Sequence, residues 1–553
     1  MFRNRFMKKK EFDSYEDYVA NGEVIVPENF NYAYDVVDVL AKEQPELKAL
    51  YWTNDEGEKK ILTFKDISEL SNQAANILKS AGIAKGDTVL LCLRRRYEYW
   101  YMMMALHKIG AVAIPSTSQL KSHDIEYRLK MADIKGVIVF KESVATEVEE
   151  AIAMNTSSVQ AKILVGGSRS GWIDLHQEMK TASKKLERIP THNDSPLLIY
   201  FTSGTTGMPK MVRQNHTYPL GHIHTACFWQ QLKKGDLHFT LSETGWAKCS
   251  WGKMYGQWIA EATVFVFDFE SKFAPSDMLK ALEKHKITSF CAAPTVYKML
   301  IRENFEEYNL KSIKKAEVAG EPLNPEVYRI FYEATGVKLK EGFGQSETVV
   351  MLFTNQWMEP KPGSMGKPAA GWKIELLGDN DKPVKVGEIG EISVNIENGR
   401  PAGLFEEYIG NKKQNEKSFR NGYYHTGDMA YADEDGYFWF VGRNDDLIKS
   451  SGYRISPFEV ESILLEHPAV KECAVTGVPD DLRGVVVKAS VILNKYFTPS
   501  DALIADIQNY VKKTTAPYKY PRIIEFMDEL PLTISGKIKR AVIRTLDQEK
   551  RKK

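Results

Sequence analysis

The sequence is poor in cysteine. Its 553 residues include five cysteines, which are widely separated and form no C-x-x-C pair. This scarcity argues against a zinc site and against a disulfide framework, because both need cysteines in close or paired spacing. It is typical of reduced, mostly buried thiols, so we expect a cytoplasmic protein.

The sequence also lacks long apolar runs and an excess of one charge. The most apolar stretch, Tyr99 to Pro115, is interrupted by His107 and Lys108, whereas a membrane-spanning helix needs roughly 20 apolar residues. Lys and Arg number 74 against 73 Asp and Glu, for a net charge of +1. We therefore expect no integral membrane association and no partner among nucleic acids. Homo-oligomerisation stays open.

The basic N-terminus, MFRNRFMKKK, is followed by acidic residues rather than an apolar core. This pattern does not fit a secretory signal, and it leaves an organelle-targeting role open.

Short β-rich runs alternate with helical periodicity over the first two-thirds of the chain. A helical pattern over residues 64–81 precedes a strand pattern over 88–93, and the same order recurs near Thr263 and Ser289. This alternation predicts right-handed βαβ units and parallel sheets. Because the chain is longer than one core normally supports, we expect several subdomains.

The sequence pattern changes after about Gly363. From there to Gly442, glycines and short strand-like runs dominate. A polar segment follows, and beyond it lies a compact pattern of helices and strands. We therefore predict an α/β fold. Its large N-terminal domain, residues 1–443, holds two βαβ-type sheet subdomains and a small β subdomain. A small α+β domain covers residues 444–553.

The strongest local motif is YFTSGTTGMPK, from Tyr200 to Lys210. A β-rich run enters a segment of glycines and hydroxyl residues that ends in lysine. Glycines let backbone N–H groups approach an anion, and the hydroxyls add donors, so this segment suits a polyphosphate. It is not a Walker A loop. The alternative is a flexible surface loop.

Three weaker motifs follow along the chain: EGFGQSET at Glu341–Thr348, YHTGD at Tyr424–Asp428 with Arg443 downstream, and PLTISGKIKR at Pro531–Arg540. A glutamate after a hydroxyl residue can hold Mg²⁺ near a phosphate. An acid beside an arginine is a common ribose contact. Taken singly, each of these charged residues is equally compatible with a solvated surface position.

Taken together, and with VAGEPL at Val318–Leu323 and GRNDDLIKSSGYRI at Gly442–Ile455, these motifs resemble the adenylate-forming superfamily. The resemblance spans roughly Pro27 to Arg544, and it is greatest to the medium-chain acyl-CoA synthetases. It implies that a carboxylate reacts with ATP to give an acyl-adenylate, from which CoA then displaces AMP. No enzyme nucleophile is needed, so catalysis rests on positioning and electrostatics.

The resemblance assigns nucleotide-binding roles by motif. The phosphates of ATP would be held by Thr202, Ser203, Gly204, Thr205, Thr206, Gly207 and Lys210. The adenine slot would be formed by Gly320, Glu321, Pro322, Glu341, Gly342 and Phe343, followed by Gly344 and Gln345. Ser346 would touch the α-phosphate, Glu347 would bind Mg²⁺, and Asp428 with Arg443 would hold the ribose. Lys537 would bridge the carboxylate and the α-phosphate as a catalytic cation.

In relatives the C-terminal domain rotates between the two half-reactions, and Asp445 matches the hinge position. Ser451, Gly452 and Tyr453 would then line the pantetheine path of CoA. Candidate contacts to the CoA phosphates are Arg454, Arg483 and Lys519. The alternative for Arg483 and Lys519 is a solvated surface cation.

The acyl pocket is expected among Trp229, Trp246, Lys248, Trp251 and Gly344. Acetyl-specific relatives carry tryptophan at the position of Gly344, so glycine there predicts room for a longer acid; the alternative is a glycine needed for backbone geometry. For Lys248 the favoured alternative is an outward-facing position. Amino-acid-activating relatives place an aspartate in this segment, and here the only acid is Glu243, which disfavours an amino acid substrate.

These observations predict an AMP-forming acid–thiol ligase that makes a medium-chain or branched acyl-CoA, with Mg²⁺, ATP and CoA. Two rivals remain. One is an adenylating enzyme that loads a carrier protein, and the other is a catalytically silent nucleotide-binding regulator.

Overall fold

The computed structural model describes residues 1–154, 158–202, 209–450, 453–480, 484–532 and 537–552. They form two compact units. The large unit comprises residues 1–202, 210–373 and 396–415, and the second unit includes 374–395 and 416–553. The domain boundary predicted between residues 443 and 444 lies within the second unit, and it stays a prediction.

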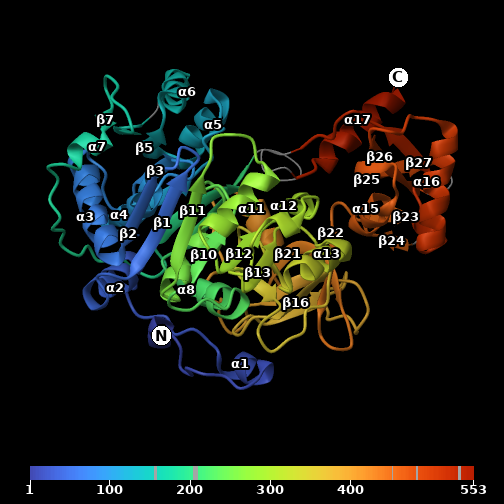
Figure 1. Ribbon diagram of the computed structural model, residues 1–553, viewed down its shortest axis with the longest axis horizontal. Coiled ribbons are helices and arrows are strands. Elements are labelled where there is room, and N and C mark those ends of the chain that lie inside the picture. Colours follow the sequence, from blue (N-terminus) through green and yellow to red (C-terminus); the bar gives the residue numbers. More distant parts are fainter. Residues whose placement is uncertain (155–157, 203–208, 451–452, 481–483, 533–536, 553) are drawn as a thin grey trace. The chain divides into compact units, whose positions relative to one another are not determined.

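An eight-stranded sheet forms one half of the large unit, with strand order β19-β9-β8-β4-β3-β5-β6-β7. Its strands are β3 (Thr88–Cys92), β4 (Val112–Pro115), β5 (Ile134–Phe140), β6 (Ala161–Val165), β7 (Ile173–Asp174), β8 (Pro196–Thr202), β9 (Lys210–Asn215) and β19 (Glu407–Tyr408). The strands from β8 to β7 pair in parallel. One helix lies between each pair of successive strands from β3 to β6, as the βαβ prediction requires (Figure 1). In chain order these helices are α4 (Glu98–Ile109), α5 (Ser122–Ala132) and α6 (Glu142–Ala153).

A second sheet in the large unit runs in the order β16-β15-β14-β13-β12-β10-β11-β1-β2. Its strands are β1 (Lys48–Asn54), β2 (Lys59–Thr63), β10 (Leu237–Thr240), β11 (Thr263–Asp268), β12 (Ser289–Ala292), β13 (Lys315–Ala319), β14 (Leu339–Gly344), β15 (Val350–Phe353) and β16 (Ser364–Pro368). The run from β1 to β14 is parallel. Helices α11 (Pro275–Lys284), α12 (Pro294–Leu300) and α13 (Pro325–Thr335) supply the crossovers, and their apolar faces bury Leu282, Tyr297 and Phe331.

Local sequence explains where these helices begin and end. Helix α3 (Phe64–Ser80) starts at a capping box, in which Thr63 and Asp66 satisfy each other's backbone N–H groups. Its apolar residues recur at helical spacing, and Ile67, Ala74 and Leu78 are fully buried. In the part of the chain described here, no helix is long and apolar enough to cross a membrane.

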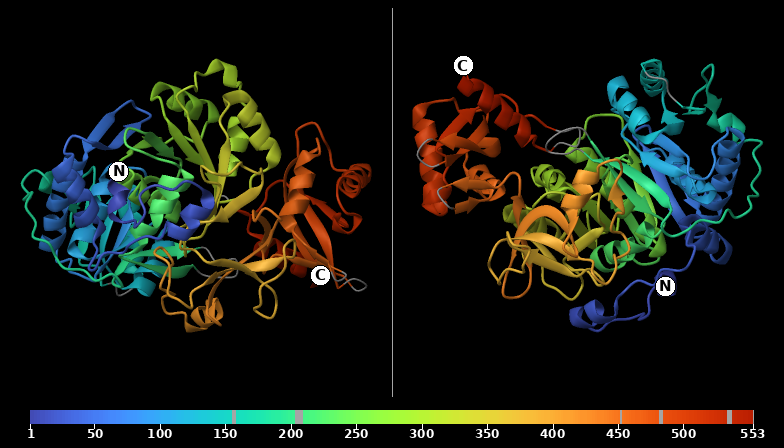
Figure 2. Two further views of the ribbon diagram at one scale, coloured as in Figure 1. Left: turned by 90° about the horizontal axis from the view of Figure 1, so that it is seen from below. Right: turned by 180° about the vertical axis from the view of Figure 1, so that it is seen from behind.

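The second unit holds an antiparallel sheet and a separate α+β layer (Figure 2). The first contains β17 (Ile374–Leu377), β18 (Gly390–Asn395), β20 (Phe419–Arg420), β21 (Tyr423–Ala432) and β22 (Phe438–Arg443). The second contains β25 (Val470–Asp480), β26 (Gly484–Leu493) and β27 (Ile523–Phe526) with helices α15 (Pro457–Glu466), α16 (Asp501–Thr514) and α17 (Arg540–Lys552). These elements match the sequence patterns, and the predicted α/β fold class is confirmed.

The N-terminal segment packs against a π-helical turn of the large unit. This turn, η3, covers His224–Trp229, and π-helical turns often occur at functional sites. The Tyr18 hydroxyl lies 2.8 Å from His224 Nδ1, and the Tyr18 ring lies 4.4 Å from the Phe228 ring, centroid to centroid. Also buried in this segment are Phe2, Phe6 and Met7. The basic N-terminus is therefore built into the fold, where it supports the helix that ends at Trp229.

Replacing Tyr18 by phenylalanine should destabilise the large unit by about 1–3 kcal/mol, because the fully buried His224 ring would lose its hydroxyl partner. Urea unfolding with a probe of the large unit would measure this change. Tyr496→Phe is the matched control, since Tyr496 is 94% exposed and should leave the midpoint unchanged. Equal midpoints for all three proteins would show that the segment is not held at Tyr18.

Candidate functional site

The first site motif lies at the turn between β8 and β9. These strands are antiparallel, and Thr202 pairs with Lys210 across the hairpin. The expected phosphate-binding residues Ser203, Gly204, Thr205, Thr206 and Gly207 lie outside the described residues. The structure therefore places the two ends of the motif side by side at the edge of the eight-stranded sheet.

A tyrosine joins this motif to the Glu347 motif. Lys210 Nζ lies 5.2 Å from the ring centroid of Tyr408, within the range of a cation–π interaction. The Tyr408 hydroxyl donates to Glu347 Oε1 at 2.8 Å. Tyr408 reaches this place because β19 pairs antiparallel with β9. Sequence reasoning missed Tyr408, since a tyrosine in a two-residue strand carries no motif of its own.

Hydrogen bonds to its backbone groups hold the EGFGQSET segment in place. Gln214 of β9 donates to the Ser346 carbonyl at 2.9 Å, and Phe405 N–H donates to the Glu347 carbonyl at 2.8 Å. Gln345 N–H donates to the hydroxyl of Thr348 at 2.9 Å, and Thr348 is fully buried. These contacts hold the backbone of Ser346 and Glu347, so their side chains start from a fixed position.

Glu341 holds the loop that follows β13. Its fully buried carboxyl accepts from Gly363 N–H at 2.6 Å and from Leu323 N–H at 3.3 Å. Burial raises the pKa of Glu341 to about 8, while these two donors oppose the rise. Gly320 starts the loop with a φ of +112°, a region that favours glycine.

Glu321 and Pro322 follow Gly320 in the same loop. Glu321 accepts from the Thr295 hydroxyl at 2.7 Å. The loop expected to form the adenine slot is therefore attached to β14 through Glu341 and to α12 through Thr295.

The expected acyl-pocket tryptophans meet β14. The Trp229 indole N–H donates to the Lys340 carbonyl at 3.0 Å. A Cβ added at Gly342 would lie 2.8 Å from the indole, so glycine is required for this close approach. Trp251, in helix α9 (Ala247–Lys253), lies 5.7 Å from Trp229 between ring centroids.

Lys248 points inward toward the sheet rather than only to solvent. Its ammonium donates to the Ala319 carbonyl at 3.0 Å and lies 5.6 Å from the Trp251 ring centroid. Ala319 directly precedes Gly320, so Lys248 ties the tryptophan-bearing helix to the loop after β13. Trp246 stands immediately before this helix and is half-buried.

Gly344 is constrained by the neighbouring backbone. A Cβ there would lie 2.3 Å from the Val349 carbonyl oxygen. Any side chain would have to move the turn that carries Ser346 and Glu347, so tight backbone packing accounts for this glycine by itself. The role of Gly344 in acyl-chain length stays a prediction, and a Gly344→Trp variant would not test it cleanly.

Within the second unit, Asp428 and Arg443 are partners. They pair in register between β21 and β22, and Arg443 Nη1 lies 3.3 Å from Asp428 Oδ1. Arg443 also donates to the Thr426 carbonyl at 3.2 Å. The strand pairing brings Asp428 and Arg443 together although they are 15 residues apart in the sequence. A ribose contact that uses both residues requires this proximity.

Asp445 lies in a turn directly after β22. The Arg443 carbonyl accepts from the N–H groups of Asp446 and Leu447 at 3.1 and 3.0 Å. Arg443 Nε lies 3.6 Å from Asp445 Oδ1. The hinge role of Asp445 stays a prediction.

The expected CoA contacts are described only in part. Ser451, Gly452 and Arg483 lie outside the described residues, and the backbones of Tyr453 and Arg454 belong to β24 (Tyr453–Ile455), which pairs with β23 (Ile448–Ser450). Lys519 forms an ion pair with Glu459 at the start of α15. A CoA phosphate would therefore compete with Glu459 for Lys519.

Lys537 is exposed in the second unit. A β-bridge between Leu532 and Ile538 closes the loop that carries it, and Lys539 N–H donates to the Pro531 carbonyl at 2.8 Å. The exposed ammonium of Lys537 is accessible to a substrate.

The folded residues thus define a nucleotide-handling α/β enzyme with a glycine- and hydroxyl-rich hairpin, a glutamate motif and an acid–arginine pair. Family models agree over most of the chain. Residues 37–400 match the AMP-binding enzyme model, and residues 459–537 match the AMP-binding enzyme C-terminal domain.

Individual relatives extend the match to nearly the full length. Human mitochondrial acyl-coenzyme A synthetase ACSM3 is 41% identical over 551 residues, covering 98% of this chain and 94% of that protein. The anthranilate CoA ligase AuaEII in complex with anthranoyl-AMP has a TM-score of 0.85 and 30% identity, covering 96% of this chain and 99% of that one. An acyl-CoA synthetase from Brucella canis has a TM-score of 0.73 at 30% identity, covering 98% and 100%. The chain belongs to the AMP-binding enzyme family, among its acyl-CoA synthetases.

The raised pKa of Glu341 predicts a pH dependence of stability. Between pH 4.5 and about 8 the folded chain keeps a proton that the unfolded chain releases. The free energy of unfolding should therefore fall as pH rises through this window, by at most about 1.4 kcal/mol per pH unit from this group. Urea unfolding across the window should show that Glu341→Gln removes this part of the slope.

Glu333→Gln is the control for this experiment, because Glu333 lies on the exposed face of α13. It should leave the slope unchanged. A Glu341→Gln variant with the wild-type slope would mean that the Glu341 carboxyl is already ionised in the folded protein.

Proposed function

We propose that this enzyme activates a medium-chain or branched carboxylic acid with ATP and transfers the acyl group to CoA. The observation that carries the proposal is the Lys210–Tyr408–Glu347 arrangement, which joins the phosphate motif and the glutamate motif within one unit. A cation and a carboxylate at that spacing suit a polyphosphate with its bound divalent cation. The family membership supplies the reaction class.

Glu347 fits Mg²⁺ in this scheme. The described residues contain no cluster of three or more His, Cys, Asp and Glu side chains suited to a metal. This agrees with a Mg²⁺ that takes only one or two carboxylates and completes its shell with substrate phosphates and water. Bound there, Mg²⁺ would neutralise phosphate charge. The Tyr408 hydroxyl would orient the Glu347 carboxylate, and Lys210 would face the phosphates.

Nucleotide binding is proposed to divide among three groups of residues. The loop from Gly320 to Pro322, with Glu341 to Phe343, would receive adenine. Asp428 would accept from the ribose hydroxyls while Arg443 holds that carboxylate in place. Ser346 would donate to the α-phosphate, where negative charge grows in the transition state.

The two half-reactions are proposed to use different faces of the C-terminal segment. Lys537 would bridge the carboxylate and α-phosphate oxygens during adenylation. Rotation about Asp445 would then bring the residues of the CoA path, Ser451, Gly452, Tyr453, Arg454, Arg483 and Lys519, into use. A change of backbone angles in a polar turn is a common way to move such a segment.

The acid is proposed to lie along Trp229 and Trp251, whose packed indoles leave an apolar wall beside β14. The inward position of Lys248 adds a cation near this wall. Glu243 pairs with Arg95 through Oε1, so its negative charge is already compensated within the protein. This supports a carboxylic acid without an amino group.

Carrier-protein loading and nucleotide-dependent regulation remain the alternatives. Both would share the adenylation site, so only turnover distinguishes them. The decisive experiment is acid-dependent ATP–pyrophosphate exchange over a panel of acids, followed by CoA addition. Exchange plus acyl-CoA supports the proposal, exchange without acyl-CoA supports a carrier protein, and no exchange with any acid supports a regulator.

The cellular location and the pathway form a further part of the proposal. All five cysteines are buried and free, which suits the reducing cytoplasm and a reducing organelle equally. The human relative is named mitochondrial. We keep the cytoplasmic assignment, and a role in fatty acid metabolism, as predictions that subcellular fractionation and the acid panel would test.

Lys537→Ala should cripple adenylation but spare acyl-CoA formation from supplied acyl-adenylate. Losing one donor to developing charge costs about 3–4 kcal/mol, or roughly 10²–10³ in rate. The two half-reactions should be measured separately in folded protein. Lys539→Ala is the neighbouring control and should change neither rate by more than a small factor. Equal losses in both half-reactions would contradict a role confined to adenylation.

Trp251→Ala should shift preference toward longer acids, because removing an indole opens space for several methylenes. Each methylene is worth about 1–3 kcal/mol in a fitted pocket, so selectivity should move by more than tenfold. The measurement is kcat/KM for straight acids from two to eight carbons. Trp172→Ala, in the core cluster beside the eight-stranded sheet, is the control. An unchanged profile for Trp251→Ala would place the acyl pocket elsewhere.

A further inference from the structure

The loop between β10 and α9 is anchored at four consecutive residues. Lys253 donates to the Ser242 carbonyl, and Arg95 forms an ion pair with Glu243. The Thr244 hydroxyl donates to the Arg94 carbonyl. Gly245 packs so closely that an added Cβ would lie 2.3 Å from the backbone of Ser116 and Thr117. The loop therefore enters α9 in one defined position.

Among the ion pairs in the described part of the chain, Arg95–Glu243 is the one that holds a side chain of this loop. The guanidinium pairs with Glu243 and also donates to the Phe269 carbonyl. Its carbon lies 4.1 Å from the Phe269 ring centroid. Arg95 and Glu243 side chains are 12% and 21% exposed, so water screens their attraction only in part.

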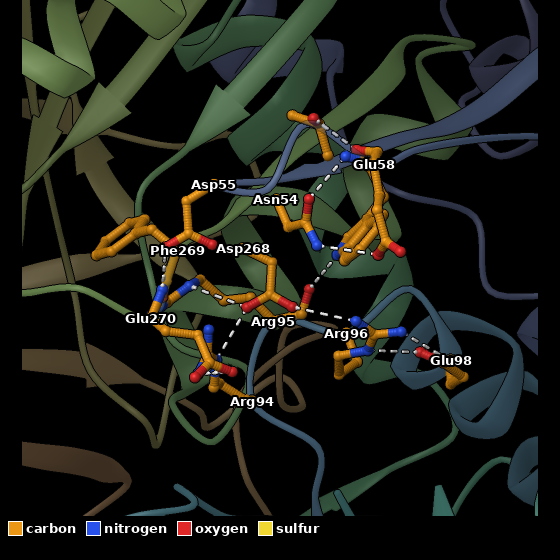
Figure 3. A network of polar contacts seen from close by, with 12 residues as sticks. Asn54, Asp55, Glu58, Arg94, Arg95, Arg96, Glu98, Asp268, Phe269 and Glu270 are labelled. Atoms are coloured by element: carbon orange, nitrogen blue, oxygen red, sulfur yellow. Dashed lines mark hydrogen bonds and ion pairs between the residues drawn. The ribbon is translucent and has the colours of Figure 1, made fainter. Parts of the chain in front are cut away.

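A wider ion network holds Arg95 in place (Figure 3). Asp268, at the end of β11, accepts from Arg94 Nε at 2.9 Å and lies 3.9 Å from Arg95 and from Arg96. Arg96 in turn pairs with the buried Glu98 at 3.2 Å. The network is centred on one carboxylate. It reaches the α9 loop through the Arg95 side chain, which pairs with Glu243, and through the Arg94 backbone carbonyl, which accepts from Thr244.

A lysine could not replace Arg95 in this arrangement. Arg95 uses separate arms of one planar group for Glu243 and for the Phe269 carbonyl, and it stacks its face on the Phe269 ring. A lysine ammonium is a compact charge without this flat, forked shape. The geometry thus points to a need for arginine and not merely for positive charge.

We propose that Arg95, through Glu243, is a positioning residue that sets the register of α9 and thereby the acyl-chain selectivity of the enzyme. The proposal rests on the proposed function, because α9 carries Lys248 and Trp251 of the expected acyl pocket. A shift of about 1 Å in a positioning element can cost on the order of 100-fold in rate. In the described part of the chain, the ion pairs named for the network do not involve an expected nucleotide-binding residue, so ATP binding should be spared.

The test compares Arg95→Lys and Glu243→Gln with Arg96→Lys, taken from the same arginine run. For the first two we expect a flattened chain-length profile over acids from two to eight carbons. The KM for the preferred acid should rise about tenfold or more, while the KM for ATP stays within about twofold. Arg96→Lys is expected to lower Tm without changing the profile.

Hydrogen–deuterium exchange on the free enzyme gives a readout that does not need turnover. Peptides covering residues 242–253 should exchange faster in Arg95→Lys and Glu243→Gln than in the wild type and in Arg96→Lys. If Arg95→Lys does not fold, Glu243→Gln carries both measurements.

An Arg95→Lys enzyme with the wild-type profile, or an Arg96→Lys enzyme with an equally altered one, would overturn the proposal. So would unchanged exchange over residues 242–253. Failure of the proposed function would give a different result: the wild type would show no ATP–pyrophosphate exchange with any acid. Hydrogen–deuterium exchange over residues 242–253 would still show whether Arg95 and Glu243 hold the loop.

Discussion

The antiparallel attachment of β9 to both β8 and β19 is the constraint on which the site of the large unit depends. Through β8 it returns the chain so that Thr202 and Lys210 stand opposite each other. Through β19 it delivers Tyr408, whose hydroxyl reaches Glu347. Backbone hydrogen bonds thus place a cation, a phenol and a carboxylate together before any substrate binds, which lowers the reorganisation needed for catalysis.

Close packing around β14 links the residues expected to bind the nucleotide with those expected to line the acyl pocket. Gly342 allows the Trp229 indole to lie against the strand, and Glu341, next to it, holds the loop that begins at Gly320. Lys248 contacts the carbonyl directly before that loop. Because side chains alternate along a strand, neighbouring residues can serve opposite faces of one sheet. A change on the acyl side is therefore close to the residues expected to hold adenine.

Much of the fold followed from patterns in the sequence. The helical periodicity of α3 and the β-rich run of β3 predicted these elements because each pattern depends on neighbours a few residues away. The sequence pattern did not predict the π-helical turn over His224–Trp229. Its contacts to Tyr18, which bonds to His224 and packs on Phe228, come from a distant segment. For Gly344 the sequence left two explanations open. The contact with Val349, which forms only when the turn closes, supports the one from backbone geometry.

The sequence by itself determined the class of chemistry, since the hydroxyl–glycine segment, Glu347, Asp428, Arg443 and Lys537 each bring a functional group whose nature needs no structure. Tertiary structure alone decided which of these groups meet and what supports them. Tyr408 and Arg95 carry no local signal: a phenol or a guanidinium has the same chemistry anywhere in a chain. They become informative only where strand pairing brings Tyr408 to Glu347 and where the turn after β3 brings Arg95 to Glu243. Such contacts join residues far apart in sequence, and only the closed fold holds them together.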